Sequence, residues 1–264
     1  NFVKNNDSIF YSGGHGTSVL STISANSPGT MIGSAPGASV YLFVTEDGSS
    51  EYPIEEHNWA AGAEMADSLG ADMISSSLGY SEFDDAGFNY TYEDMDGNTT
   101  MVTRAADFAA AKGMIVCSSA GNQGNSNWFY ITAPADADSI LTVGAVDSVG
   151  LLTSFSSNGP SSDGAVKPDV VAQGIRATVV EPFSGTIVSG NGTSYSNPII
   201  AGITACLWQA HPDKSNIEII EAIKKSASLY FNPNDSMGYG IPNFEVADLM
   251  LSDKAPQDLS LSKP

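Results

Sequence analysis

Three short segments of the chain each combine small residues with one reactive side chain. They are residues 14–17 with His15, residues 118–124 with Asn122, and residues 191–198 with Ser194. A hydroxyl, an imidazole and a neutral amide are the nucleophile, the base and the oxyanion donor that acyl transfer at a carbonyl needs. Singly, each segment also fits a turn, a loop or a helix cap. Their occurrence together in one chain favours chemistry over three unrelated turns.

Ser194 follows a glycine-containing turn and begins an apolar helical stretch over residues 194–209. Its hydroxyl is therefore expected at a helix N-terminus, where unpaired N–H groups and the helix dipole favour a developing negative charge. Gly192 permits a substrate backbone to approach closely. Pro198 is compatible with this helix because it falls in the first turn.

The other two segments are placed by their neighbours. Asn122 comes just after an apolar run at residues 113–118, so its amide is expected at the C-terminal end of a buried strand, as an oxyanion donor. His15 lies between two glycines at the start of a helical pattern over residues 16–25. A neutral imidazole there is a candidate general base for Ser194.

Apolar runs and helical patterns alternate along the chain. Strands are expected over residues 38–44, 71–75, 113–118, 140–145 and 168–172, and helices over residues 16–25, 53–68, 101–111, 194–209 and from Ser215 onward. Strands that are apolar on both faces are expected to be covered by helices on both sides of the sheet. The alternation of strands and helices along the chain favours right-handed crossover connections. The sequence therefore predicts an α/β fold, a three-layer sandwich with a mainly parallel central sheet. Residues 80–100 are polar and acidic and are interpreted as a surface excursion.

Composition excludes several classes of protein. The chain has 264 residues, with 10 Lys and Arg against 30 Asp and Glu, a net charge of -20 and a pI near 4.1. Such a field repels phosphate backbones, so nucleic acid is not an expected partner. No apolar run reaches the roughly 20 residues of a membrane span.

Cys117 and Cys206 are interpreted as buried thiols. We expect one domain over residues 1–250, followed by a tail or the start of a linker over residues 251–264.

Three motifs match a known family in order and spacing. His15-Gly16-Thr17, Ser119-Ala120-Gly121-Asn122 and Gly192-Thr193-Ser194 resemble the three signature blocks of the subtilisin family of serine peptidases. The resemblance extends from His15 to roughly Asn243. An α/β-hydrolase is not indicated, because it requires the serine before the histidine in chain order.

The resemblance implies a role for each motif residue in a secreted serine endopeptidase that acts on polypeptides. Ser194 would be the nucleophile, His15 the general base and then acid, and Asn122 the oxyanion donor together with the N–H of Ser194. Thr193 would support that oxyanion hole. Two segments would bind substrate: Ser77, Leu78 and Gly79 as a ladder for an extended peptide, and Ser119, Ala120 and Gly121 as a wall of the pocket before the scissile bond. A peptide ligase on the same residues stays open.

The third member of the family's triad has no match. In the family, an Asp in an Asp-Ser-Gly or Asp-Thr-Gly turn ends an apolar strand well before the histidine. Only 14 residues precede His15, and their one acid, Asp7, is followed by Ser8 and Ile9. We interpret Asp7 as a loop acid and expect the Asp-bearing first strand in an upstream segment that acts as a partner. The alternative is a non-catalytic, peptide- or partner-binding domain that has lost its Asp.

Metal-ligand patterns are weak. Asp94, Asp96 and Asn98 alternate as in a calcium loop, but Ala105 occupies the position where an EF-hand has its bidentate Glu. We expect no cofactor, with a weak structural calcium site as the open alternative.

Overall fold

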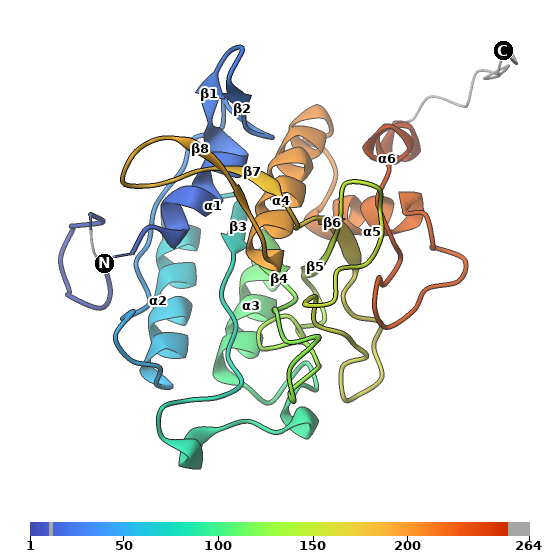
Figure 1. The fold of residues 1–264 in the computed structure, drawn as a ribbon. Helices are drawn as coiled ribbons and strands as arrows, with labels where there is room; N and C mark the ends of the chain where they lie inside the picture. Colours follow the sequence, from blue (N-terminus) through green and yellow to red (C-terminus); the bar gives the residue numbers. More distant parts are fainter. Residues whose placement is uncertain (11–12, 253–264) are drawn as a thin grey trace, which may run out of the picture.

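Four parallel strands form the centre of the structure, a computed structural model that describes residues 1–10 and 13–252 (Figure 1). Across the sheet they are β3 (Met73–Ser76), β4 (Ile115–Ser119), β5 (Leu141–Val146) and β6 (Val170–Gln173). Their pairing is parallel throughout. Four of the predicted strands are thus confirmed to within two residues at each end. From residue 253 onward, the predicted tail lies outside the described residues.

Helices cover both faces of the sheet (Figure 1). On one side lie α2 (Ile54–Ser68) and α3 (Met101–Ala111); on the other lie α4 (Thr193–Ala210), α5 (Asn216–Ser226) and α6 (Phe244–Leu251). Strand β4 shows why: Val116 is buried with the cluster of α2 and α3, whereas Ile115 and Cys117 are buried with that of α4 and α5. The predicted three-layer α/β sandwich is confirmed.

Helix α1 (His15–Ser24) packs against α4 and a hairpin. That hairpin, β7 (Ala177–Val180) with β8 (Ile187–Gly190), is held to α1 by Ser18 Oγ, which donates to the Val180 carbonyl at 2.8 Å. A smaller hairpin pairs β1 (Asn26–Ser27) with β2 (Met31–Ile32), and two 3-10 turns are η1 (Ala86–Phe88) and η2 (Tyr92–Asp94). The hairpins and α6 were not predicted.

One predicted strand is wrong. Residues 38–44 form no strand, and Val40, Tyr41 and Leu42 are 45%, 54% and 43% exposed. The reason is physical: a β-strand exists only beside a partner strand, and among the described residues this stretch has none, although the Phe2 N–H donates to the Val44 carbonyl at 2.9 Å. The edge strand β3 is likewise paired on one side only, with β4.

Two smaller expectations are corrected. Residues 80–100 are only partly a surface excursion, because Tyr80, Phe83 and Met95 bury their side chains in the core cluster of α2 and α3. Aromatic residues inside a polar stretch carry enough apolar area to be drawn into the core. Cys117 is a buried thiol as expected, but Cys206 is exposed, because it lies on an outward position of α4.

Candidate active site

The N-terminus of α4 holds the nucleophile candidate. Gly192 precedes the helix with a φ of 147°, a backbone region that favours glycine, and its N–H donates to the Gly174 carbonyl at 2.7 Å. The N–H of Ser194 lies in the first turn, where no intrahelical acceptor exists. Its carbonyl oxygen accepts a 2.9 Å hydrogen bond from Ser77 Oγ. Ser194 is 9% exposed, and in the described part of the chain its Oγ makes no hydrogen bond.

Asn122 is locked onto this helix start. Its Oδ1 accepts from the Thr193 N–H at 2.8 Å and from Thr193 Oγ1 at 3.0 Å. Because both donors engage the oxygen, the amide orientation is fixed and Nδ2 is left free as a donor. Nδ2 lies close to Gly192, where a Cβ would be 3.6 Å away. The arrangement places a neutral donor and the Ser194 N–H at one helix terminus.

His15 begins α1 and approaches the same place. Its ring centroid is 6.2 Å from that of Tyr195, the residue after Ser194, with the rings tilted by 52°. Among the described residues, His15 makes no hydrogen bond to Ser194. Desolvation by the surrounding protein lowers the pKa of His15 below its usual value. A neighbouring carboxylate would raise that pKa instead, and none contributes; Asp7 is exposed.

The two candidate substrate segments, residues 77–79 and residues 119–121, differ in how much of their backbone is already hydrogen-bonded. No backbone hydrogen bond among the described residues involves residues 77–79, so their N–H and carbonyl groups are available. In residues 119–121, the Ala120 N–H donates to the Val143 carbonyl at 3.0 Å, and its carbonyl accepts from Thr132. Gly121 has a φ of 104°. The first segment can therefore add a peptide strand more freely than the second.

Asn197, in the first turn of α4, has partners that the sequence could not name. Its Nδ2 donates to the Ser76 carbonyl at 2.8 Å, at the end of β3. Its Oδ1 is buried and has no hydrogen-bond partner in the described part of the chain. Buried side-chain acceptors are nearly always paired in native proteins. Asn197 therefore has an unsatisfied acceptor on the same side chain that contacts the end of β3.

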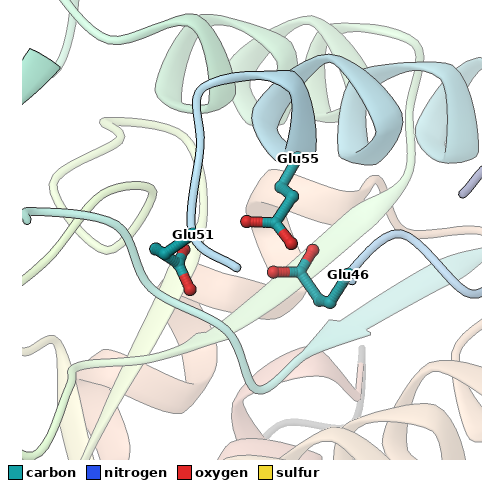
Figure 2. Close-up of side chains that lie close together, drawn as sticks. All are labelled: Glu46, Glu51 and Glu55. Carbon is teal, nitrogen blue, oxygen red and sulfur yellow. The ribbon is translucent and has the colours of Figure 1, made fainter. Parts of the chain in front are cut away.

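Sequence reasoning missed a cluster of three carboxylates. Glu46, Glu51 and Glu55 bring carboxylate oxygens within 4.8 Å of one another, and Figure 2 shows Glu46 and Glu55 facing each other. Two lie in a loop and one in α2, with no motif spacing that could have signalled the group. Tyr80 donates its hydroxyl to Glu46 at 2.7 Å. In the acidic loop that was weighed as a weak calcium site, Asp96 accepts from the N–H groups of its own turn. That no cofactor is needed stays a prediction.

The carboxylate cluster makes stability depend on pH. Burial first, and then Glu55, Glu46 and Asp84, raise the pKa of Glu51 from 4.5 to about 7. An acid with a raised folded pKa is deprotonated more readily when unfolded, so folding loses stability as pH rises from about 4.5 to about 7. We expect Glu51→Gln to raise the free energy of unfolding at pH 8 by about 1 kcal/mol, since solvent screens this half-exposed group.

Urea denaturation at pH 4 and pH 8 measures this effect. Near pH 4 the substitution is expected to change little, because Glu51 is then protonated in both states. Glu64→Gln, on the exposed side of α2, is the matched control and is expected to give no pH-dependent difference. Equal stabilisation by Glu51→Gln at both pH values would contradict the repulsion that we assign between Glu51 and its neighbouring carboxylates.

Known proteins resemble the chain over most of its length. It matches the subtilase family over residues 1–240. It is 33% identical to subtilisin DY of Bacillus licheniformis over 241 residues, which are 89% of this chain and 77% of that protein. It is also 33% identical to subtilisin E of Bacillus subtilis (strain 168) over 239 residues, 88% of this chain but only 55% of that protein. The chain belongs to the subtilase family.

Solved structures agree on the fold. The self-cleaved protease domain of PatA superposes with a TM-score of 0.72 at 22% identity, covering 90% of this chain and 83% of that one. MycP1 with its N-terminal propeptide removed gives a TM-score of 0.74 at 22% identity, covering 98% and 85%. In the described part of the chain, no helix combines the length and the apolar character of a membrane span.

Proposed function

We propose that the protein is a serine endopeptidase that hydrolyses peptide bonds through an acyl-enzyme intermediate. One observation carries the proposal: Thr193 ties Asn122 to the start of α4, so an oxyanion donor and the nucleophile Ser194 share one helix N-terminus. His15 comes from a different helix and faces the residue beside Ser194. The approach of three motifs that lie far apart in the sequence supports acyl transfer as the chemistry of this site.

In this mechanism, Ser194 Oγ attacks the carbonyl carbon of the scissile bond and its proton passes to the neutral ring of His15. The carbonyl electrons move onto oxygen, where Asn122 Nδ2 and the Ser194 N–H stabilise the charge. The C–N bond then breaks as His15 returns the proton to the leaving amine. Water repeats the sequence on the ester and frees Ser194. The lowered pKa of His15 keeps its ring able to accept the proton near neutral pH.

Substrate is assigned to the two segments beside the site. An extended peptide would hydrogen-bond to the free backbone of Ser77, Leu78 and Gly79, a recognition mode in which main-chain bonds give affinity. The residue before the scissile bond would then enter beside residues 119–121. Thr193 would support the oxyanion hole by holding Asn122 from behind.

The acid that orients His15 is assigned to an upstream segment, bound as an additional strand. Three observations support its place in the fold. The outer edge of β3 is unpaired, residues 38–42 are exposed, and Asn197 Oδ1 is buried without a hydrogen-bond partner among the described residues. A strand between residues 38–44 and β3 would supply hydrogen bonds to both. An Asp at its C-terminal end would come to the edge of the sheet where the carboxyl ends of parallel strands meet.

Location, extent and cofactors complete the proposal. We infer a secreted or extracytoplasmic protein, in keeping with its acidic, polar composition and its family. The catalytic unit is assigned to residues 1–250. The proposed mechanism uses protein groups alone and calls for no cofactor, with a weak structural calcium near residues 94–98 as the alternative.

Covalent labelling tests the proposal against its alternative, a non-catalytic peptide-binding domain. A fluorophosphonate probe reacts with a serine that is activated as a nucleophile. Labelling of the chain together with its upstream segment is expected at Ser194, mapped by peptide mass, and absent in Ser194→Ala. Peptide binding without labelling of the unmodified protein would favour the binding domain instead.

A further inference from the structure

Two serine hydroxyls tie helix α1 to the hairpin of β7 and β8, which lies beside it (Figure 1). Ser18 Oγ donates to the Val180 carbonyl at 2.8 Å, and the Val180 N–H donates to Ser21 Oγ at 2.9 Å. Ser21 Oγ also donates to the Ser18 carbonyl at 2.6 Å. The two serines are 7% and 8% exposed, so water competes little for these bonds. Ser18, Ser21 and the backbone of Val180 are called the serine clasp below.

The serine clasp lies next to His15 on the same helix. His15 and Ser18 have the i, i+3 spacing that places two residues on one face of a helix. On the other side of His15 in the sequence, a Cβ on Gly14 would overlap the ring of Pro182, near the tip of the same hairpin. The hairpin therefore contacts the chain both before and after His15, and it limits how α1 can shift or rotate.

The second strand of the hairpin leads to the nucleophile. Strand β8 ends at Gly190, and Ser194 follows in the first turn of α4. A Cβ on Gly190 would lie 2.5 Å from Cε2 of Tyr195, so the backbone of β8 packs directly on this ring. The other neighbour of the Tyr195 ring is the ring of His15, with 6.2 Å between their centroids. The hairpin thus contacts the helix of the base through β7 and the helix of the nucleophile through β8.

The contacts of His15 itself leave its placement to the backbone. Among the described residues, no hydrogen bond holds its ring. A general base must nevertheless lie within hydrogen-bond reach of the hydroxyl that it deprotonates. The two strands of the hairpin are paired from Ala177 with Gly190 to Val180 with Ile187, so a shift of one strand is passed to the other. This pairing connects the position of α1 to the start of α4.

We propose that Ser18 and Ser21 are positioning residues, which fix His15 relative to Ser194 by clasping α1 to the β7–β8 hairpin. Neither serine touches substrate or the reacting atoms; both act through His15. The inference rests on the proposed peptidase function, because that function assigns His15 as the base and Ser194 as the nucleophile.

Removing both hydroxyls tests the serine clasp. In the chain with its upstream segment, Ser18→Ala combined with Ser21→Ala is expected to lower kcat about 100-fold with little change in KM, the loss that a displacement of about 1 Å can cause. Ser24→Ala is the matched control. It removes a hydroxyl at the end of the same helix that has no hydrogen-bond partner in the described part of the chain, and it should leave kcat unchanged.

A second background separates positioning from a general loss of structure. If the serine clasp acts through His15, removing it should not lower further the residual turnover of a His15→Ala variant, because the effects of coupled residues are not additive. A merely structural role would lower turnover by the same factor in both backgrounds. That result would overturn the positioning role.

NMR of the His15 ring distinguishes this inference from the peptidase proposal. The neighbouring Tyr195 ring shifts the resonances of the His15 ring protons, so removal of the serine clasp should move them and Ser24→Ala should not. Moved resonances in a protein without turnover would overturn the peptidase function but support control of His15 by the clasp. Turnover that requires His15 but is unchanged without the clasp would overturn the positioning role alone. Unmoved resonances and no turnover would overturn both.

Discussion

Turnover of a peptide substrate is expected to rise by about 3 × 10⁴ when an upstream strand ending in an Asp-x-Gly turn is joined to residues 1–264, a magnitude taken from subtilisin itself. His15 has no carboxylate partner among the described residues, and only desolvation shifts its pKa, downward. An Asp would fix its tautomer and stabilise the imidazolium that forms when Ser194 gives up its proton. Peptidase assays of the two forms measure the ratio.

Chemistry and folding must be separated in this comparison, because the strand would also complete the sheet. Replacing the upstream Asp by Asn is the matched control: it should leave the urea midpoint of the extended chain nearly unchanged while removing most of the gain in turnover. The His15 pKa, followed by NMR, should be higher with Asp than with Asn, since a nearby carboxylate favours the charged ring. Near-normal activity of residues 1–264 alone would assign the role to another acid, such as Asp7.

Asn122→Ala is expected to lower kcat by about 10² to 10³ with little change in KM, again the magnitude known for subtilisin. The reason is geometric. Asn122 Oδ1 is held by Thr193, which aims the remaining Nδ2 donor into the space beside the Ser194 N–H. That donor meets substrate oxygen most strongly when the oxygen carries negative charge, so its loss acts on the transition state. Steady-state kinetics on an active form measure the split.

Asn122→Asp provides the sharper control. The carboxylate keeps an oxygen for the two Thr193 donors but loses the Nδ2 donor and adds a charge that repels an oxyanion. Its kcat should fall at least as far as that of Asn122→Ala while its stability falls less. A loss confined to KM in either variant would make Asn122 a binding or structural residue.

The layers of the fold and the places of the three motifs at the ends of their elements could be predicted from the sequence for the same reason, because local patterns determine both. Met101–Ala111 has helical spacing, and Ser215 with Glu218 forms the capping box expected at the start of α5. The glycines around His15 and before Ser194 likewise mark positions that the chain itself determines. Such features need only a few neighbouring residues to be recognised.

The remainder depends on contacts between distant segments. Residues 38–44 have the composition of a strand, but strand formation requires a neighbour that sequence composition does not specify. The partner of Asn197 lies on β3, and Thr132 is placed by Ala120; both contacts join residues that share no motif. The carboxylates of Glu46 and Glu55 meet only because the loop returns to the start of α2. Helix α6 was not predicted because it is only eight residues long, although Asn243 at its N-cap could have indicated where it starts.

The unpaired edge of β3 also bears on how such a protein is kept from self-association. An open edge is a template for any extended chain, including β3 of a second copy. Val40 and Leu42, in the stretch that has no strand partner among the described residues, also expose apolar side chains. An upstream strand that fills this position would therefore act as an internal chaperone as well as a carrier of the catalytic acid, because the step that completes the site would also cover an open sheet edge.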